Sequence, residues 1–463
     1  MSLETLEADY LVVGAGAMGM AFCDEILAQQ SHARIVLADR HARAGGHWNA
    51  AYSYVSLHQP AAYYGVNSEK LGSGGAALAS RAEVLSYYER VLRKLCGTGR
   101  LEHFPMCEYQ GDGSFRSIVQ PERSYRVEVR KQTVDATYMN VQVPSMRPPA
   151  YQVSPGVAVV PPNELPKVRK APSGYVVIGA GKTAIDAVLF LLDQGVEPGH
   201  IRWIMPNDAW LLDRAQIQPG RMTDGALGSQ MQVFAESRSL KEVFTLLESK
   251  QRILRLDERV WPTKYRCATV TLEELDQLRR LEQVVRMGRV VRIEPGEIVL
   301  EQGSIPTDAG QLHVDCTADG LAKREVRPVF EGGKITLQSL FMCQQVFSAA
   351  VIGHVESHYQ DEKLKNELCQ VVPHPELSRD FIAAIAISME NTRRWAAKFG
   401  RWLRGSRLFM AHHEPLYKLV LAGLRDRRYL PAATENLGRI LEQEFGSSEG
   451  PVASEPRRRA GPA

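Results

Sequence analysis

The sequence predicts an α/β protein with two parallel-sheet units, the second inserted in the first, followed by a helical C-terminal region. Each half has a glycine turn between a short apolar run and a helical pattern, at residues 14–19 and 179–184. Each half then closes on an apolar run followed by Asp-x-Thr, at residues 135–137 and 315–317. Apolar residues at helical spacing dominate after residue 337, which predicts the C-terminal helices.

These features divide the chain. We expect the first unit over residues 1–170 and the second over 171–320. Residues 321–445 would return to the first unit and form the C-terminal helices, and residues 446–463 would be a disordered tail. Seven prolines from Pro148 to Pro172 exclude a sheet interior there and predict a crossing between the units.

The first glycine turn has the spacing of a dinucleotide-binding loop. Gly14, Gly16 and Gly19 give G-x-G-x-x-G after the predicted strand at residues 10–13 and before a predicted helix at 20–29. The first glycine permits the tight turn, the second lets the backbone approach a pyrophosphate, and the third lets helix and strand pack closely. The first unit is therefore predicted to be a Rossmann-like dinucleotide-binding domain. The alternative is a glycine-rich turn without a ligand.

Four neighbouring residues complete this predicted site. Ala17 and Met18 lie at the start of the helix, where unpaired N–H groups and the helix dipole favour phosphate. A second strand, at residues 34–38, ends at Asp39, and an acid about 20 residues past the glycines is placed to bind ribose hydroxyls. Arg40 follows it and is included in the predicted site.

The second glycine turn predicts a second Rossmann-like unit. A strand at residues 174–178 leads into the turn, and Ala184 occupies the third small position, which the fingerprint allows. A Walker A loop is excluded because Val176 stands where that motif requires its first glycine. The residues that we expect at the phosphates are Gly179, Gly181, Lys182 and Thr183.

The next predicted strand, at residues 201–205, indicates which nucleotide this second unit binds. No acid stands directly at its end, where Pro206 and Asn207 follow. Arg202 and Arg214 lie nearby, and arginine suits a 2′-phosphate. This pattern favours NADPH over NADH, with Asn207 and Arg214 as binding residues.

Two short segments after Asp39 resemble those of a known family. Gly45-Gly46-His47-Trp48 is followed by Leu57-His58-Gln59-Pro60. The sequence is similar to two-dinucleotide flavoprotein monooxygenases, which carry G-G-x-W and then x-Asn-x-Pro. The resemblance implies FAD, with its ring near Gly46, His47, Trp48 and Gln59. His58 stands where the family has asparagine, and the resemblance implies a catalytic role for it.

Two dinucleotide sites in one chain predict a hydride relay from NADPH to FAD. The resemblance implies that the reduced flavin then meets O2, forms a flavin hydroperoxide and oxygenates a small organic substrate. The family's longer motif for ketone oxygenation is absent, since only residues 153–157 lie near its place. Two alternatives stay open: a reductase or dehydrogenase that passes hydride to an organic acceptor, and a non-catalytic redox sensor. Oligomeric state stays open as well.

Composition excludes several classes of function. A net charge of +3 is too small to indicate nucleic-acid binding. Seven scattered cysteines without a C-x-x-C pattern predict reduced thiols in the cytoplasm rather than a disulfide framework. The histidine pairs at 354/358 and 412/413 have no evident third ligand, so we predict no metal site.

Residues 393–403 form an amphipathic pattern. Trp395, Phe399 and Trp402 share one helical face, with Arg394, Lys398 and Arg401 on the other. One interpretation is weak contact with a membrane surface. The other is a helix whose aromatic face packs against the domain.

Overall fold

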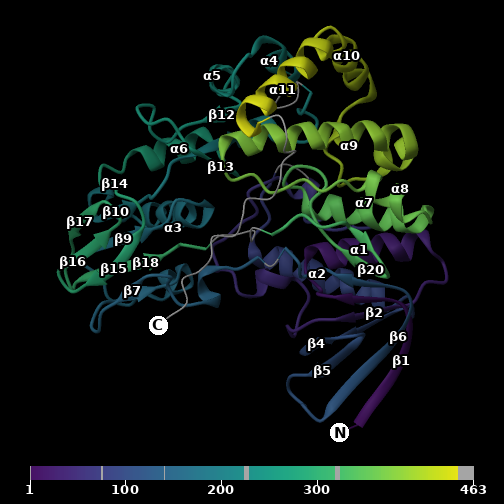
Figure 1. Cartoon of the computed structure of the whole chain (residues 1–463). Helices are drawn as coiled ribbons and strands as arrows, with labels where there is room; N and C mark the ends of the chain where they lie inside the picture. Colours follow the sequence, from purple (N-terminus) through teal and green to yellow (C-terminus); the bar gives the residue numbers. More distant parts are fainter. Residues whose placement is uncertain (1, 74–76, 140, 224–228, 319–323, 447–463) are drawn as a thin grey trace.

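The computed structural model describes residues 2–73, 77–139, 141–223, 229–318 and 324–446 (Figure 1). The tail predicted to be disordered therefore lies, from residue 447, outside the described residues. The first sheet is made of β1 (Ser2–Val13), β2 (Ile35–Ala38), β3 (Leu101–Phe104), β4 (Cys107–Gly111), β5 (Ser114–Ser117), β6 (Arg123–Asp135), β19 (Phe330–Glu331) and β20 (Lys334–Thr336).

The first sheet joins strands that precede the second unit and strands that follow it. Its order is β19-β20-β6-β1-β2-β3, with the β4–β5 hairpin on β6. β20 pairs in parallel with β6, which sets Ile335 opposite Val134. The chain thus leaves this sheet after β6 and returns to it at β19 and β20, which confirms that one unit is inserted in the other.

The second sheet is made of β8 (Val159–Val160), β9 (Gly174–Ile178), β10 (Ile201–Ile204), β14 (Val284–Val285) and β18 (Gln311–Asp315). Its order is β14-β10-β9-β18-β8, and all of its pairs are parallel. β8 precedes residue 171, where we placed the start of the second unit, yet it pairs with β18 of that unit.

Two small sheets flank the second unit. One contains β11 (Ala209–Asp213), β12 (Ile253–Leu254) and β13 (Lys264–Val270). The other contains β7 (Gln152–Val153), β15 (Val290–Glu294), β16 (Glu297–Leu300) and β17 (Gly303–Pro306).

The helices lie around these sheets (Figure 1). They are α1 (Ala17–Gln29), α2 (Arg81–Cys96), α3 (Lys182–Asp193), α4 (Gln230–Glu236), α5 (Leu240–Ser249), α6 (Leu272–Arg279), α7 (Gln345–His358), α8 (Glu362–Leu368), α9 (Ser378–Gly405), α10 (Leu416–Arg427) and α11 (Leu430–Phe445). None of these described helices is both long and apolar enough to cross a bilayer.

α1 and α7 pack closely over the first sheet. A Cβ placed on Gly353 would lie 3.0 Å from the Cβ of Glu25, so this glycine permits the close approach. The uncharged run predicted a helix from Gln338, but α7 begins only at Gln345. The hydroxyl of Ser348 accepts from the backbone N–H of Leu340 at 2.9 Å, which holds the preceding segment in a non-helical path.

The C-terminal helices join the two parts of the molecule. α9 and α11 share a buried cluster with β11, β13, α4 and α5, and the four helices and β13 lie close together in Figure 1. In this cluster the rings of Tyr265 and Phe381 are 4.3 Å apart. α7 and the later part of α9 share another cluster with the first unit. The C-terminal region therefore packs on both units.

Candidate active site

The first glycine turn lies against two other backbone segments. A Cβ on Gly14, whose φ is +106°, would lie 3.0 Å from the Cγ2 of Thr137. A Cβ on Gly16 would lie 3.7 Å from the Cα of Gly46, and one on Gly19 only 2.0 Å from the carbonyl oxygen of Gly14. Gly19 therefore permits the turn to close on α1. Gly16 has no close clash with the chain, so the fold alone does not require a glycine there.

The G-G-x-W segment is fixed to this turn. The Gly45 N–H donates to the carbonyl of Ala15 at 2.9 Å. Residues 46–49 then form one short 3-10 turn, and Arg81 donates to the carbonyls of Trp48 and Asn49, both at 2.9 Å. The first glycine turn therefore packs against Gly46 at Gly16 and against Ala136 at Gly14 and Gly19.

The aromatic residues beside this turn are buried. Trp48 is 6% exposed and donates from Nε1 to the hydroxyl of Tyr64 at 2.8 Å. Arg407, from the far end of the chain, donates to the carbonyls of Ala62, Tyr64 and Val66. Burial and, to a smaller extent, His41 lower the pKa of His47 to about 4. Sequence reasoning missed Arg407 and Arg81 because neither belongs to a local motif.

The carboxylate of Asp39 is hydrogen-bonded to the first glycine turn. Its Oδ2 accepts from the N–H of Ala15 at 2.5 Å, and its Oδ1 accepts from the N–H of His41 at 2.6 Å. The residue is 5% exposed, whereas Arg40 is exposed. Ala17 and Met18 begin α1, where the first N–H groups have no partner within the helix.

His58 lies between the two units. Its carbonyl accepts from the hydroxyl of Thr269 in β13. Burial, assisted by the charges of Lys182 and Arg214, lowers the pKa of its ring to about 4. At this pKa the ring is not the proton source near neutrality that an unperturbed histidine would be. His58 is neutral at pH 7.

Buried polar atoms without described partners lie on the ring of His58 and on two glutamines at the start of α7. The Nδ1 of His58 is buried and has no hydrogen-bond partner among the described residues. Gln59 accepts at Oε1 from the Nε2 of Gln344 at 2.9 Å. The Oε1 of Gln344 and the Nε2 of Gln345 are likewise buried without described partners, at the start of α7. A polar, flat ligand such as a flavin ring fits this set of donors and acceptors.

The second glycine turn has the same plan as the first. A Cβ on Gly179, whose φ is +132°, would lie 2.7 Å from the carbonyl oxygen of Cys316, so only glycine fits there. Nothing lies within 4 Å of a Cβ built on Gly181, which precedes α3. Lys182 and Thr183 are the first residues of α3 and are only partly buried. This turn is open on the side where a phosphate would approach.

The second turn is also tied to the first unit. Lys182 forms an ion pair with Asp186, and the hydroxyl of Tyr52 donates to the same carboxylate at 2.6 Å. Tyr54 stacks on Phe190 of α3 with ring centroids 4.2 Å apart. The segment just before His58 is thereby held against the second nucleotide turn.

The sequence analysis expected Arg202 in β10 and Arg214 after it to favour a 2′-phosphate, but both side chains have partners within the protein. Arg214 is 5% exposed and pairs with Glu274 at 2.8 Å. Arg202 donates to the carbonyl of Pro306 at 2.5 Å and to Gln283. Both guanidinium groups are thus engaged within the protein. Arg214 instead places its charge near His58.

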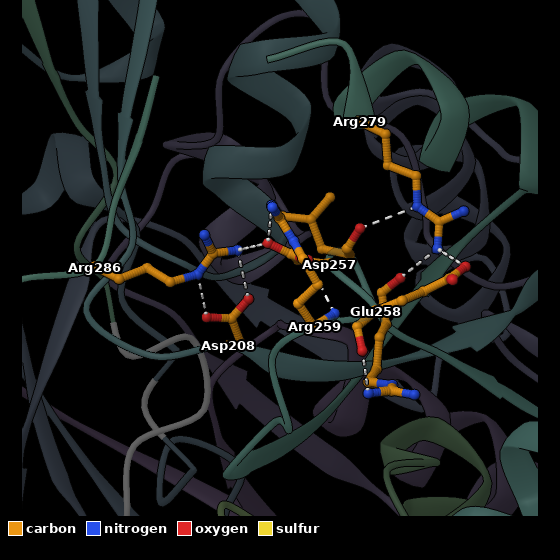
Figure 2. Close-up of polar contacts among 8 residues, drawn as sticks. Asp208, Asp257, Glu258, Arg259, Arg279 and Arg286 are labelled. Atoms are coloured by element: carbon orange, nitrogen blue, oxygen red, sulfur yellow. Dashed lines mark hydrogen bonds and ion pairs between the residues drawn. The ribbon is translucent and has the colours of Figure 1, made fainter. Parts of the chain in front are cut away.

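An ion-pair cluster, shown in Figure 2, lies beside Asn207 instead. Arg286 donates to both carboxylate oxygens of Asp208, at 2.8 and 3.1 Å, and lies 3.6 Å from Asp257. Arg259 pairs with Asp257 at 3.0 Å, and its own side chain is 89% exposed. Arg286 therefore neutralises Asp208, the acid nearest to this strand end, while Arg259 and Glu258 of the cluster are both exposed.

Two cysteines correct the expectation of thiols that are all reduced. Cys267 and Cys343, 76 residues apart, form a disulfide. Cys23, Cys96, Cys107, Cys316 and Cys369 are free. No local spacing could have predicted this pair, because its partners come from β13 and from the segment before α7.

The aromatic face of residues 393–403 is core. Trp395 is fully buried and donates to the carbonyl of Leu368 at 2.7 Å. Phe399 is 8% exposed, and Trp402 donates to Glu25 of α1 at 2.6 Å. This face packs on the first unit and is not available to a membrane surface, so the alternative of membrane contact through it is wrong.

Comparison with known proteins gives the family. No family model matches the chain. The uncharacterized protein Rv2000 of Mycobacterium tuberculosis (strain H37Rv) is 44% identical over 470 residues, which span 96% of this chain and 87% of that protein. The chain belongs to the family of this mycobacterial protein. An uncharacterized member of the family from Mycobacterium bovis, Mb2023, matches to the same extent.

Solved structures show the fold of the family. A crystal structure of cyclohexanone monooxygenase bound to ε-caprolactone matches with a TM-score of 0.50 and 11% identity, over 92% of this chain and 99% of that one. A mutant flavin monooxygenase from Stenotrophomonas maltophilia matches with a TM-score of 0.47 and 14% identity, over 77% of this chain and 100% of that one. The first of these matches confirms the predicted fold, two Rossmann-like units with the second inserted in the first.

Proposed function

We propose that the protein is an NADPH- and FAD-dependent monooxygenase that inserts one oxygen atom from O2 into a small organic substrate. The observation that carries the proposal is the packing of the first glycine turn against Gly46 and Ala136, together with the buried, unpaired polar atoms of His58, Gln344 and Gln345. The first feature suits a pyrophosphate, and the second suits the polar edge of a flavin.

The first unit would hold FAD. The N–H groups at Gly16, Ala17 and Met18, at the start of α1, would bind the pyrophosphate. Asp39 would bind the ribose, exchanging its present bond with the Ala15 N–H for ribose hydroxyls. Gln59, Gln344 and Gln345 would pair with the ring.

The second unit would hold NADPH. Gly181 leaves open space in front of α3, and Lys182 and Thr183 add unpaired N–H groups there. Arg259 would receive the 2′-phosphate, because its guanidinium is exposed and its partner Asp257 lies 3.6 Å from Arg286 in the cluster of Figure 2. This replaces the role that the sequence argument gave to Arg202 and Arg214.

Bound FAD, once reduced by NADPH, supplies the electrons that activate O2. The chain contributes orientation and control of protons. Neutral His58 has one ring N–H donor and one acceptor, so it would offer a hydrogen bond at the reacting face without being a strong acid. The Tyr52–Asp186–Lys182 contacts would keep the two nucleotides at a fixed separation.

Isotope transfer tests oxygen insertion. The protein would be incubated with NADPH, heavy-isotope O2 and a panel of thioethers, amines and ketones, followed by mass spectrometry of the products. We expect the heavy oxygen in a thioether or amine product. NADPH consumption with hydride recovered in a reduced organic acceptor, and no isotope in any product, would favour the reductase alternative.

A further inference from the structure

The Cys267–Cys343 disulfide lies next to the residues that we assign to the flavin. Cys343 precedes Gln344, whose amide donates to Gln59 at 2.9 Å. On the other side, Thr269, two residues after Cys267, donates to the carbonyl of His58. Both cysteines are therefore within two residues of a direct contact with the segment that contains His58 and Gln59.

The backbone at both sides of the pair is unusual. Trp210 of β11 pairs with Tyr265 of β13, and Leu212 of β11 pairs with Thr269 of β13. Three residues of β13 therefore bulge opposite one residue of β11. Cys267 is the middle residue of this bulge and has a φ of +55°, while Met342 beside Cys343 has a φ of +42°. Such conformations are costly for residues other than glycine, and they gather at functional sites, where bulges redirect side chains.

A histidine accompanies the pair. The Nδ1 of His374 lies 3.8 Å from the Sγ of Cys343. Burial and, to a smaller extent, Arg266 lower the pKa of His374 to about 4 against the opposing charges of Glu376 and Asp380. His374 is thus neutral beside this sulfur and can accept a hydrogen bond from a thiol. Cys343 is also partly exposed and sits just before α7, where the helix dipole favours a thiolate.

We propose that Cys267 and Cys343, with His374, form a redox-active centre that exchanges two electrons with the flavin. The inference rests on the proposed function, because it needs bound FAD as the electron donor. Reduced flavin gives two electrons and two protons, the S–S bond breaks, and two S–H bonds form while the flavin returns to its oxidised state. The ring of His374 would hydrogen-bond the reduced sulfur of Cys343.

Differential alkylation tests this centre on the whole protein. The purified holoprotein is incubated anaerobically with or without NADPH, alkylated with N-ethylmaleimide in denaturant, and analysed by peptide mass spectrometry. We expect Cys267 and Cys343 to be unlabelled without NADPH and both labelled with it. Dithionite titration of the same protein should consume about four electrons per bound flavin, two for the flavin and two for the disulfide.

Three variants sharpen the test. Cys343→Ser should lower the titration to about two electrons per flavin while leaving the flavin bound. Gly181→Val should keep both cysteines unlabelled with NADPH but allow labelling after dithionite, because only the nucleotide route is blocked. Cys96→Ser, at a partly buried free thiol, should lose one label in every state and leave the titration unchanged.

Each result separates the inference from the proposed function. A yellow protein whose flavin is reduced while both cysteines stay unlabelled overturns the inference and leaves the proposed function standing. Full labelling of both cysteines without any reductant overturns it as well. A protein that binds no flavin overturns both.

Discussion

Gly16→Ala separates ligand binding from folding in the first nucleotide turn. The new Cβ would lie 3.7 Å from the nearest chain atom, the Cα of Gly46, which is ordinary van der Waals contact. Gly16 has a φ of −76° and a ψ of −177°, an extended conformation that alanine also adopts. The fold should therefore tolerate the change, while a methyl group would occupy the place where a pyrophosphate approaches the backbone.

The size of the effect follows from the bonds that would be lost. A hydrogen bond from a backbone N–H to a charged oxygen contributes about 1.5–3 kcal/mol. A phosphate displaced by a methyl group would lose roughly two of them, or about 3–6 kcal/mol. Since about 1.4 kcal/mol is tenfold in affinity, we expect FAD to bind about a hundredfold to ten-thousandfold more weakly.

The assay is flavin content and affinity, measured by absorbance and by titrating the apoprotein with FAD, beside thermal unfolding of the apoprotein. Gly19→Ala is the comparison, because its Cβ would lie 2.0 Å from the carbonyl oxygen of Gly14 and must deform the turn. We expect Gly16→Ala to keep the melting temperature of the wild-type apoprotein and Gly19→Ala to lower it. Full flavin content in Gly16→Ala would refute the assignment of this turn.

Three further predictions concern other parts of the molecule. Gly181→Val should keep the yellow colour but abolish flavin reduction by NADPH, since a Cβ there has no atom of the chain within 4 Å; normal reduction in stopped-flow absorbance would contradict this. Because folding lowers the pKa of His58 from about 6.5 to about 4, the contribution of its neutral ring to the free energy of unfolding should be complete above about pH 6.5 and lost as the pH falls toward 4. This loss should be at most about 3 kcal/mol relative to His58→Asn, and equal acid unfolding curves would contradict it. Trp395→Ala should destabilise the fold by about 3–5 kcal/mol in denaturant unfolding, because this buried ring fills a core; a surface role would leave the free energy of unfolding unchanged.

The glycine turns were predictable because their chemistry is local. Gly14 and Gly179 need positive φ angles and stand at fixed distances from a strand and a helix, so spacing alone identifies them. The insertion of one unit in the other also followed, since the Asp-x-Thr sequences mark the end of each sheet's last central strand.

Contacts between distant segments were not predictable. Arg407 binds carbonyls more than 340 residues earlier, and Cys267 meets Cys343 across 76 residues. The pKa of His58 depends on Lys182 and Arg214, which fall near it only after the two units pack. The amphipathic pattern at 393–403 was real, but a helix face does not reveal whether a protein core or a membrane covers it.

The central claim is that two nucleotide sites in this chain act in series on oxygen. The most direct measurement is the visible spectrum of the purified protein, recorded anaerobically, after addition of NADPH, and after admission of air. We predict a flavin spectrum that NADPH bleaches and that air restores with consumption of O2. A colourless protein that gains no flavin spectrum when FAD is added, or a flavin spectrum that NADPH leaves unchanged, would contradict the account.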